Sequence, residues 1–432
     1  MPESTPSVTL DPVAGKSKPR LLQRLGPGLI TGAADDDPSG IATYAQAGAQ
    51  FGFGLGWTLL LTYPLMVAIQ AICARIGRTT GQGIAANLRD HYPDWLLQSI
   101  VAMLFAANVL NIGADLGAMA EAAALMLPLP AWVYVVTFAL VCTAGPVFLK
   151  HSRYIAVLKW LTASLLAYFA TLAVVHVRWT SLLEGLLWPR LTLNRDFWLL
   201  VVGVLGTTIS PYLFFWQAAQ EVEDTKAEPL REPLLRRPAQ AADALERIRV
   251  DTLAGMGVSN LVALAIMVTT AATIHEHGAR EIESAAQAAQ ALRPLAGEAA
   301  AALFALGILG TGLLSVPVLA GSAAYALGEA RRWPVGLSHA PRRARAFYLT
   351  IVLATVLGAL ENVAAVKPLE ALVWAAVLNG IVAAPIMVLI MLSSARPAIM
   401  GKFRISGRLA IGGWTATGVM GIASLTFILL SL

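Results

Sequence analysis

Three consecutive acidic residues, Asp35, Asp36 and Asp37, stand directly before Pro38 within an otherwise apolar stretch of the chain. A carboxylate inside a membrane-spanning segment costs about 3 kcal/mol or more, so an ionisable residue there indicates a functional site. Proline breaks a helix because it lacks an amide hydrogen. Residues 33–44 therefore predict an unwound turn that offers carboxylates to a cation. The alternative is a kinked helix with a solvated acidic end.

A second proline, Pro211, interrupts another apolar stretch, residues 206–217, and follows Ser210. In lipid every backbone amide must be satisfied internally. An unwound turn at bilayer depth therefore survives only where it lines a cavity or is buried in protein. Two breaks of this kind are typical of a transport site.

The composition fixes the class of protein. Of 432 residues, 57% are hydrophobic and only 13% are charged, and the mean hydropathy is +0.67. These values exclude an ordinary soluble domain and predict a polytopic membrane protein. The formal charge of +5 indicates contact with anionic membrane lipid rather than with nucleic acid. Cys73 and Cys142 lie in apolar stretches and are expected to be free thiols.

Apolar windows of about 20 residues predict eleven membrane-spanning helices, and the basic residues orient them. With the N-terminus in the cytoplasm and the C-terminus outside it, 25 of the 31 Lys and Arg residues fall in cytoplasmic segments, as the positive-inside rule requires. Residues 1–20 form a cytoplasmic tail. The predicted spans are 22–50 (broken), 55–76, 98–127, 131–149, 155–177, 197–220 (broken), 252–274, 297–328, 346–365, 369–394 and 409–431.

The breaks fall in the first and sixth of these helices. The two breaks are offset by five helices along the chain, and an odd number of crossings makes the two halves inverted. Inverted repeats of five helices with discontinuous helices at the midplane describe the LeuT-like architecture. We therefore expect an all-α fold with one repeat over 21–177, a second over 197–394, and an eleventh helix, 409–431, outside both repeats.

Residues 21 to 395 resemble the NRAMP divalent-metal transporters. The family's first helix carries Asp-Pro-Gly-Asn where this chain has Asp37-Pro38-Ser39-Gly40, and its sixth helix carries Met-Pro-His where this chain has Ser210-Pro211-Tyr212. The further similar segments are Gly26-Pro27-Gly28, Asp115-Leu116, Arg249-Val250-Asp251-Thr252 with Asn260, and Ala320-Gly321.

In that family the Asp, the Asn and the Met ligate a transition metal, and only Asp37 remains here. Gly40 removes the Asn oxygen, and Ser210 replaces a soft thioether by a hydroxyl. The resemblance implies a metal site of Asp37, Gly40, Ser210, Tyr212 and the backbone carbonyl of Ile209. Oxygen ligands suit Mg²⁺, Ca²⁺ or Mn²⁺. The pattern is similar to the NRAMP-related Mg²⁺ transporter branch, so we expect Mg²⁺ as substrate, with Mn²⁺ also carried.

Proton coupling is expected to be weak or absent, because Tyr212 and Gln217 replace the two His residues of the family's sixth helix. The membrane potential alone supplies about 4.6 kcal/mol per 100 mV to a divalent ion, twice the value for one charge. Against this, Asn108, Asn111 and Asp115 share one helical face. They form either a polar path or a set of interhelical hydrogen bonds.

For three further residues, the sequence leaves two possible roles open. Asp35 and Asp36 form either an acidic vestibule that concentrates cations or plainly solvated side chains. Asn379 lies in the middle of the tenth helix and either reaches the site or makes a packing hydrogen bond, which we favour.

The sequence thus favours an importer of divalent metal ions in the cell membrane. The alternatives are a proton-coupled Mn²⁺/Fe²⁺ symporter and a LeuT-like carrier of small organic substrates; a membrane sensor is disfavoured. No spacing typical of an enzyme occurs. We expect no cofactor beyond the transported ion, and no obligate protein partner.

Overall fold

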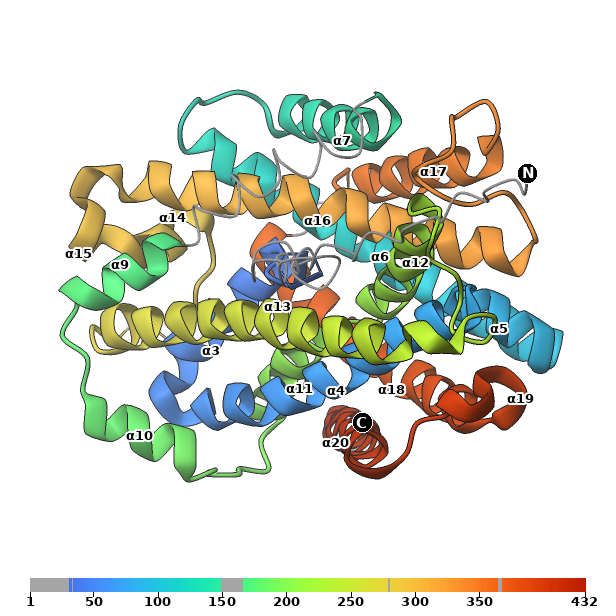
Figure 1. The fold of residues 1–432 in the computed structure, drawn as a ribbon. Coiled ribbons are helices and arrows are strands. Elements are labelled where there is room, and N and C mark those ends of the chain that lie inside the picture. The colour runs from blue at the N-terminus through green and yellow to red at the C-terminus, as the bar shows by residue number, and fades with distance from the viewer. Residues whose placement is uncertain (1–30, 33, 149–165, 279, 364–366) are drawn as a thin grey trace, which may run out of the picture.

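The computed structural model describes residues 31–432 apart from 33, 149–165, 279 and 364–366, and the described residues form helices without a strand. Seven stretches of helix in this part of the chain are long and apolar enough to cross a membrane. Figure 1 shows α7 and α17 together along one edge of the molecule, whereas α20 lies at the opposite edge beside α18 and α4. The predicted tail, residues 1–20, lies outside the described residues.

The first half of the chain contains the first broken helix and the helices that follow it. Residues 31–32 and 34–35 are helical before the break. The elements that follow are α3 (Pro38–Phe51), η1 (Gly52–Leu55), α4 (Gly56–Thr80), α5 (Ile84–His91), α6 (Asp94–Ala124), α7 (Ala131–Phe148) and α9 (Leu166–Val174).

The second half begins with a short helix and then the second broken helix. Its elements are α10 (Trp179–Leu187), α11 (Arg195–Thr208), α12 (Pro211–Ala227), η3 (Pro238–Gln240), α13 (Ala241–Thr270), η4 (Ala271–His275), α14 (Ala285–Ala289), η5 (Gln290–Leu292), α15 (Arg293–Ala296), η6 (Gly297–Ala299), α16 (Ala300–Ala330), α17 (Arg345–Glu361), α18 (Pro368–Ala395), α19 (Pro397–Met400), η7 (Gly401–Phe403) and α20 (Gly407–Ser431).

Each of the eleven predicted spans has a helical counterpart in the described chain, the first and the fifth only in part. The seventh predicted span, 252–274, belongs to a helix that extends further toward the N-terminus, because α13 begins at Ala241. Its first turns carry charged side chains and therefore escape a search for apolar windows. The short helices α5 and α10 escape the same search because they are too short to span a bilayer.

Both predicted breaks are present. Asp37 is extended, with φ −70° and ψ 169°, and Pro38 begins α3. Ile209 and Ser210 leave the helical region, with ψ values of 57° and 132°, and Pro211 begins α12. Proline suits the first position of a helix, where its missing amide hydrogen costs nothing.

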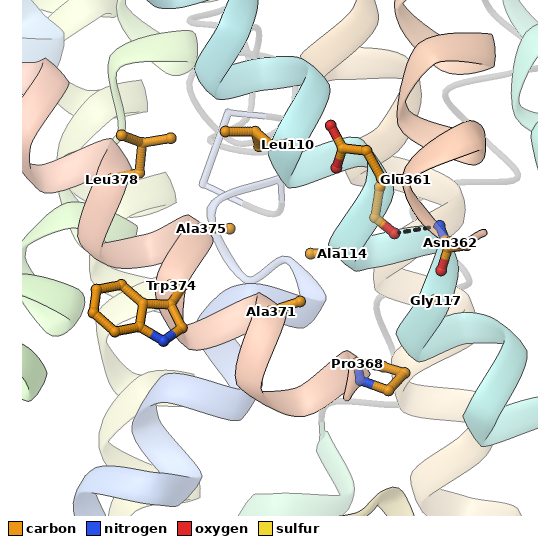
Figure 2. A pocket seen from close by; sticks show the side chains of 11 residues that line it. Leu110, Ala114, Gly117, Glu361, Asn362, Pro368, Ala371, Trp374, Ala375 and Leu378 are labelled. Carbon is orange, nitrogen blue, oxygen red and sulfur yellow. Dashed lines mark hydrogen bonds between the residues drawn. The ribbon is translucent and has the colours of Figure 1, made fainter. Parts of the chain in front are cut away.

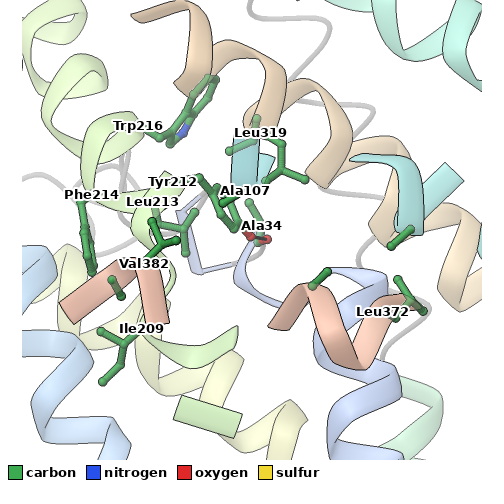
Figure 3. Packing of buried hydrophobic residues seen from close by; sticks show 14 of the residues in the cluster. Ala34, Ala107, Ile209, Tyr212, Leu213, Phe214, Trp216, Leu319, Leu372 and Val382 are labelled. Atoms are coloured by element: carbon green, nitrogen blue, oxygen red, sulfur yellow. Dashed lines mark hydrogen bonds between the residues drawn. The ribbon is translucent and has the colours of Figure 1, made fainter. Parts of the chain in front are cut away.

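Apolar side chains pack tightly around the breaks. Figure 3 shows Tyr212, Leu213 and Trp216 of α12 beside Leu319 of α16 and Ala34. Small residues let backbones approach closely. A Cβ atom placed on Gly206 would lie only 2.1 Å from the carbonyl oxygen of Ala376 on α18. This packing fixes the ends of the broken helices relative to their neighbours.

Candidate metal-binding site at the two helix breaks

Asp37 is buried, with 1% of its surface exposed, and accepts four hydrogen bonds. Its Oδ1 accepts from the Ser39 hydroxyl at 2.6 Å and from the Gly40 amide at 2.7 Å. Its Oδ2 accepts from the Asn111 amide at 3.0 Å and from the Tyr212 hydroxyl at 3.3 Å. A carboxylate has about four lone-pair positions. A cation that binds Asp37 must therefore displace at least one of these donors.

The local sequence explains the position of Asp37. Aspartate is a preferred N-cap because its side chain accepts a bond from an amide of the first helical turn, here that of Gly40. The positive end of the α3 dipole also favours a negative charge at this point. Oδ1 is thus committed to α3, and Oδ2 is the oxygen that faces other helices.

Tyr212 joins the two breaks. Its hydroxyl donates to the Ala34 carbonyl at 2.9 Å, besides its contact with Asp37, and its own carbonyl accepts from Ser322 of α16 at 2.7 Å. The structure therefore brings Tyr212 against Asp37, as the sequence predicted for a residue of the site.

Ser210 and Ile209 lie at the second break. The Ser210 hydroxyl donates to the carbonyls of Gly206 and Thr207, both at 2.8 Å, so its hydrogen stabilises the end of α11. Only its lone pairs remain for a cation. Pro211 has no amide hydrogen for the Thr207 carbonyl four residues before it, and the Ser210 hydroxyl donates to that carbonyl instead.

Gly40 leaves no room for a larger side chain. A Cβ atom there would lie 2.9 Å from Oγ1 of Thr207 and 3.3 Å from Cε2 of Tyr44. Thr207 and Tyr44 therefore occupy the space that an Asn side chain at position 40 would need. Thr207 and Tyr44 are site residues that the sequence analysis missed.

The polar face of α6 makes hydrogen bonds to three other elements. Asn111 accepts from the Asn379 amide at 3.4 Å, in addition to its bond with Asp37. Asn108 donates to the Leu319 carbonyl at 2.9 Å. Asp115 accepts from Ser315 at 2.8 Å. These bonds are the interhelical set that was one of the two alternatives, and Asn379 touches Asp37 only through Asn111.

Asp35 and Asp36 are buried, with exposed fractions of 0% and 2%. Of the two alternatives drawn from the sequence, plain solvation is wrong for these side chains, and the vestibule stays a prediction. The Ser259 hydroxyl of α13 lies 2.7 Å from Oδ2 of Asp35 and 3.3 Å from Oδ1 of Asp36. Helix α13 packs against both side chains, and no pattern in the sequence predicts that packing.

Gln217 is also part of a helix contact, because its Oε1 accepts a hydrogen bond from the hydroxyl of Thr31. The remaining partners missed by the sequence analysis are all small hydroxyl residues on apolar helices. Such residues are common at packed helix interfaces, so their presence in a sequence does not indicate which of them lie at the site. They are Thr31, Ser39, Ser259, Ser315 and Ser322.

The donor set consists of oxygen atoms. Among the described residues no three His, Cys, Asp or Glu side chains gather into a metal-binding group. Several buried oxygens near the breaks make no hydrogen bond, namely Asp35 Oδ1, Asn108 Oδ1, Asp115 Oδ1 and Asn379 Oδ1. A hard cation with its own water suits such ligands.

Beyond the site, the segment that includes α14 packs over α3 and α6. The amide of Ile282 donates to Gln46 at 2.9 Å, and the amide of Ala285 donates to Glu121 at 2.8 Å. Outside this layer lies a cavity of about 360 Å³ lined by Gln46, charged residues such as Arg195 and Glu370, and others. Asp37 does not line this cavity, and Ile41, which follows Asp37 on α3, is buried.

A separate cavity of about 560 Å³ lies between α6, the end of α17 and α18 (Figure 2). Its lining is mainly apolar, with Glu361 and Asn362 as polar exceptions, and Asp37 does not contribute to it. This cavity is therefore not the ion site.

A family model described as natural resistance-associated macrophage protein-like matches residues 28–430. A divalent metal cation transporter, MntH, of Aeromonas hydrophila is 30% identical over 311 residues, which cover 69% of this chain and 71% of that protein. The MntH of Acidiphilium cryptum is 28% identical over 443 residues, covering 99% of this chain and 95% of that protein.

The fold has counterparts among solved structures. The manganese transporter of Eremococcus coleocola, in complex with an aromatic bis-isothiourea substituted compound, superposes with a TM-score of 0.73 at 15% identity, covering 96% of this chain and 88% of that chain. The inward-facing conformation of Mhp1 superposes with a TM-score of 0.52 at 12% identity, covering 94% and 91%. These likenesses confirm the predicted LeuT-like fold.

Proposed function

The chain belongs to the NRAMP family of transporters, and from that premise we propose that it carries divalent metal ions, Mg²⁺ and Mn²⁺, by alternating access at Asp37. It is a multi-pass membrane protein and not an enzyme. The observation that carries the proposal is the burial of one carboxylate, Asp37, where the two broken helices meet, with its Oδ2 facing Asn111 and Tyr212.

The choice of Mg²⁺ rests on the oxygen ligands. Ser210 offers hydroxyl lone pairs where a thioether would favour softer ions, and Asp37 is the one carboxylate at the centre of the site. Mg²⁺ usually keeps several waters when it binds to protein. A site with one carboxylate and neutral oxygens accepts such a hydrated ion. Mn²⁺ takes the same ligands, and the Eremococcus coleocola protein that shares this fold is a manganese transporter.

The absence of proton coupling rests on Tyr212 and Gln217. Both side chains are engaged in hydrogen bonds, with Asp37 and Thr31 respectively, and neither type titrates near neutral pH. Metal entry then follows the electrochemical gradient. The proposed orientation places the N-terminus in the cytoplasm and the C-terminus outside the cell membrane, because most basic residues fall in segments assigned to the cytoplasm. The two repeats, 21–177 and 197–394, would rock against each other around the site.

Transport by purified protein in liposomes tests this proposal. We expect uptake of Mg²⁺ and Mn²⁺ driven by an inside-negative potential, without acidification of the lumen, and loss of uptake in Asp37→Ala. The matched control is Glu184→Gln, which removes an acid on α10 whose side chain is 69% exposed. Uptake that survives Asp37→Ala contradicts the site, and acidification comparable to the metal influx contradicts the uncoupled mechanism.

A further inference from the structure

The segment between α16 and α17, residues 331–344, is basic and contains no Asp or Glu. Together with the first residue of α17 it carries five arginines, all of them exposed to solvent. None of the five makes an ion pair with the described part of the chain. They are Arg331, Arg332, Arg342, Arg343 and Arg345. The positive charge of this segment is therefore not neutralised by the protein itself.

The arginines lie at a membrane surface. Helix α16 is long and apolar enough to cross a membrane and ends at Ala330, one residue before the first arginine. The segment then returns to α17, so both of its ends lie on the same side of the bilayer. The ring of Trp333 is 36% exposed, and tryptophan is typical of the interface between lipid and water. The guanidinium groups are thus placed at the level of lipid headgroups.

The segment keeps its shape without help from the arginine side chains. The Glu223 carboxylate on α12 accepts hydrogen bonds from the amides of Leu337 at 2.7 Å and Ser338 at 3.2 Å. The Tyr348 hydroxyl of α17 donates to the His339 carbonyl at 2.9 Å. These contacts fix the backbone to two helices. The arginine side chains consequently remain available for a partner outside the protein.

Arg332 adds an independent observation, because its backbone is in the left-handed region, with φ 58°. The amide of Trp333 donates to the Gly328 carbonyl at 2.8 Å, and that of Arg332 donates to the Glu329 carbonyl at 3.3 Å. This is the Schellman pattern that ends many helices, and its left-handed position is usually occupied by glycine. A side chain there strains the backbone, and such strain indicates a functional role for the residue.

We propose that these five arginines form a surface that binds the phosphate groups of anionic phospholipids. Arginine suits phosphate because its planar guanidinium group can donate two parallel hydrogen bonds. Groups of about four to eight basic residues directly beside a membrane-spanning helix are typical of anionic-lipid binding. Trp333 places the surface within the headgroup layer, where the partner is a lipid and not a soluble phosphate. The inference goes beyond the proposed metal transport and does not depend on it.

Thermal unfolding tests the surface on full-length protein that has been purified in detergent and freed of native lipid. Phosphatidylglycerol is titrated while tryptophan fluorescence follows unfolding. We expect the unfolding temperature to rise, because a ligand of the folded state stabilises it. Phosphatidylcholine and soluble glycerol phosphate should have no such effect. An ionic strength of about 0.5 M should weaken the response to phosphatidylglycerol, since salt screens exposed charges.

The variant Arg342→Gln/Arg343→Gln removes two of the five charges. An arginine near an anionic surface contributes about fivefold to affinity, so the lipid concentration at half of the response should rise by roughly tenfold or more. The matched control is Arg178→Gln/Arg190→Gln, which removes two exposed arginines that already pair with acids. Its midpoint should stay unchanged. An equal response to phosphatidylcholine, or an unchanged midpoint in Arg342→Gln/Arg343→Gln, overturns the surface.

Arg332→Gly separates lipid binding from folding, because glycine adopts the left-handed conformation without strain. Without lipid this variant should unfold at a higher temperature than the unaltered protein, yet its lipid midpoint should rise about fivefold. Arg332→Lys retains the charge and should retain most of the affinity. An unchanged midpoint in Arg332→Gly overturns the role of Arg332 in the surface. A lower unfolding temperature without lipid overturns the functional reading of its backbone conformation.

Discussion

The hydroxyl of Tyr212 lies 3.3 Å from Oδ2 of Asp37, so the helix that follows the second break holds the carboxylate at the first. Asn111 donates to the same oxygen at 3.0 Å. An ion that enters competes with both donors for one atom. Tyr212, the residue after Pro211, therefore affects how Asp37 binds an ion.

Tyr212→His should make metal uptake depend on pH. An unperturbed imidazole titrates near pH ~6.5. Below that value its positive charge next to Asp37 opposes a cation, so Mn²⁺ uptake into liposomes should fall as the pH decreases. Tyr212→Phe is the control, because it loses the hydroxyl without gaining a titratable group. Identical pH profiles for the two variants would refute the proximity of this side chain to the ion.

Asn111→Ala should weaken Mn²⁺ binding by roughly tenfold, the effect expected when a group that orients a metal ligand is lost. Asn379→Ala should weaken it less, since Asn379 touches Asp37 only through Asn111. In a double-mutant cycle the second change should add nothing once Asn111 is removed. Additive losses measured by calorimetric titration would show that Asn379 reaches the ion by itself.

Gly40→Ala should lower the temperature of unfolding, because its Cβ atom meets Oγ1 of Thr207 at 2.9 Å. Overpacking of this kind typically costs about 1–3 kcal/mol. Thr207→Ala removes the opposing atom, so the double variant should recover most of the loss. Thr207→Ser keeps an oxygen at the same place and serves as the control. Thermal unfolding in detergent followed by fluorescence measures all four proteins.

Ser210→Met should move ion preference toward softer metals. The change replaces a hydroxyl by a thioether, which is a soft ligand. The measurement is competition of Cd²⁺ against Mg²⁺ in liposome uptake, with Ser210→Ala as the control for loss of the hydroxyl alone. If Met and Ala give the same ratio of inhibition, residue 210 does not contact the ion.

Loss of the contacts made by Gln46 and Glu121 should open the cavity of about 360 Å³ that Gln46 lines. These side chains accept hydrogen bonds from the Ile282 and Ala285 amides. A cysteine at Ala42, which lines the same cavity, reports the opening through its rate of labelling by a membrane-impermeant thiol reagent. We expect faster labelling of Ala42→Cys when Gln46→Ala and Glu121→Ala are added.

The native thiols give little background in that experiment, because Cys73 and Cys142 are buried. Ala42→Cys with Glu184→Gln is the matched control. An unchanged labelling rate in the Gln46→Ala/Glu121→Ala background would mean that these two contacts do not control access to residue 42.

Much of the scaffold follows from the sequence. Pro38 and Pro211 stand at the first positions of α3 and α12, directly after the two breaks, where the missing amide hydrogen costs nothing. Pro64, Pro317 and Pro385 instead lie inside α4, α16 and α18, so a proline by itself does not fix a break. Asp37 caps α3 for an equally local reason. The spacing of the breaks and the apolar windows were enough to predict the LeuT-like fold, which the solved structures confirm.

The partners of the site depend on tertiary structure. Nothing in the sequence brings Ser259 to Asp35, Thr207 to Gly40 or Asn379 to Asn111, because these contacts join helices far apart in the chain. Asp35 and Asp36 illustrate the limit. The sequence shows two acids beside an unwound turn and leaves their exposure to water open, whereas the packing of α13 buries both. The sequence determines residue types and local backbone geometry. Burial of a side chain depends on which helices pack against it, and that packing is set only by the tertiary structure.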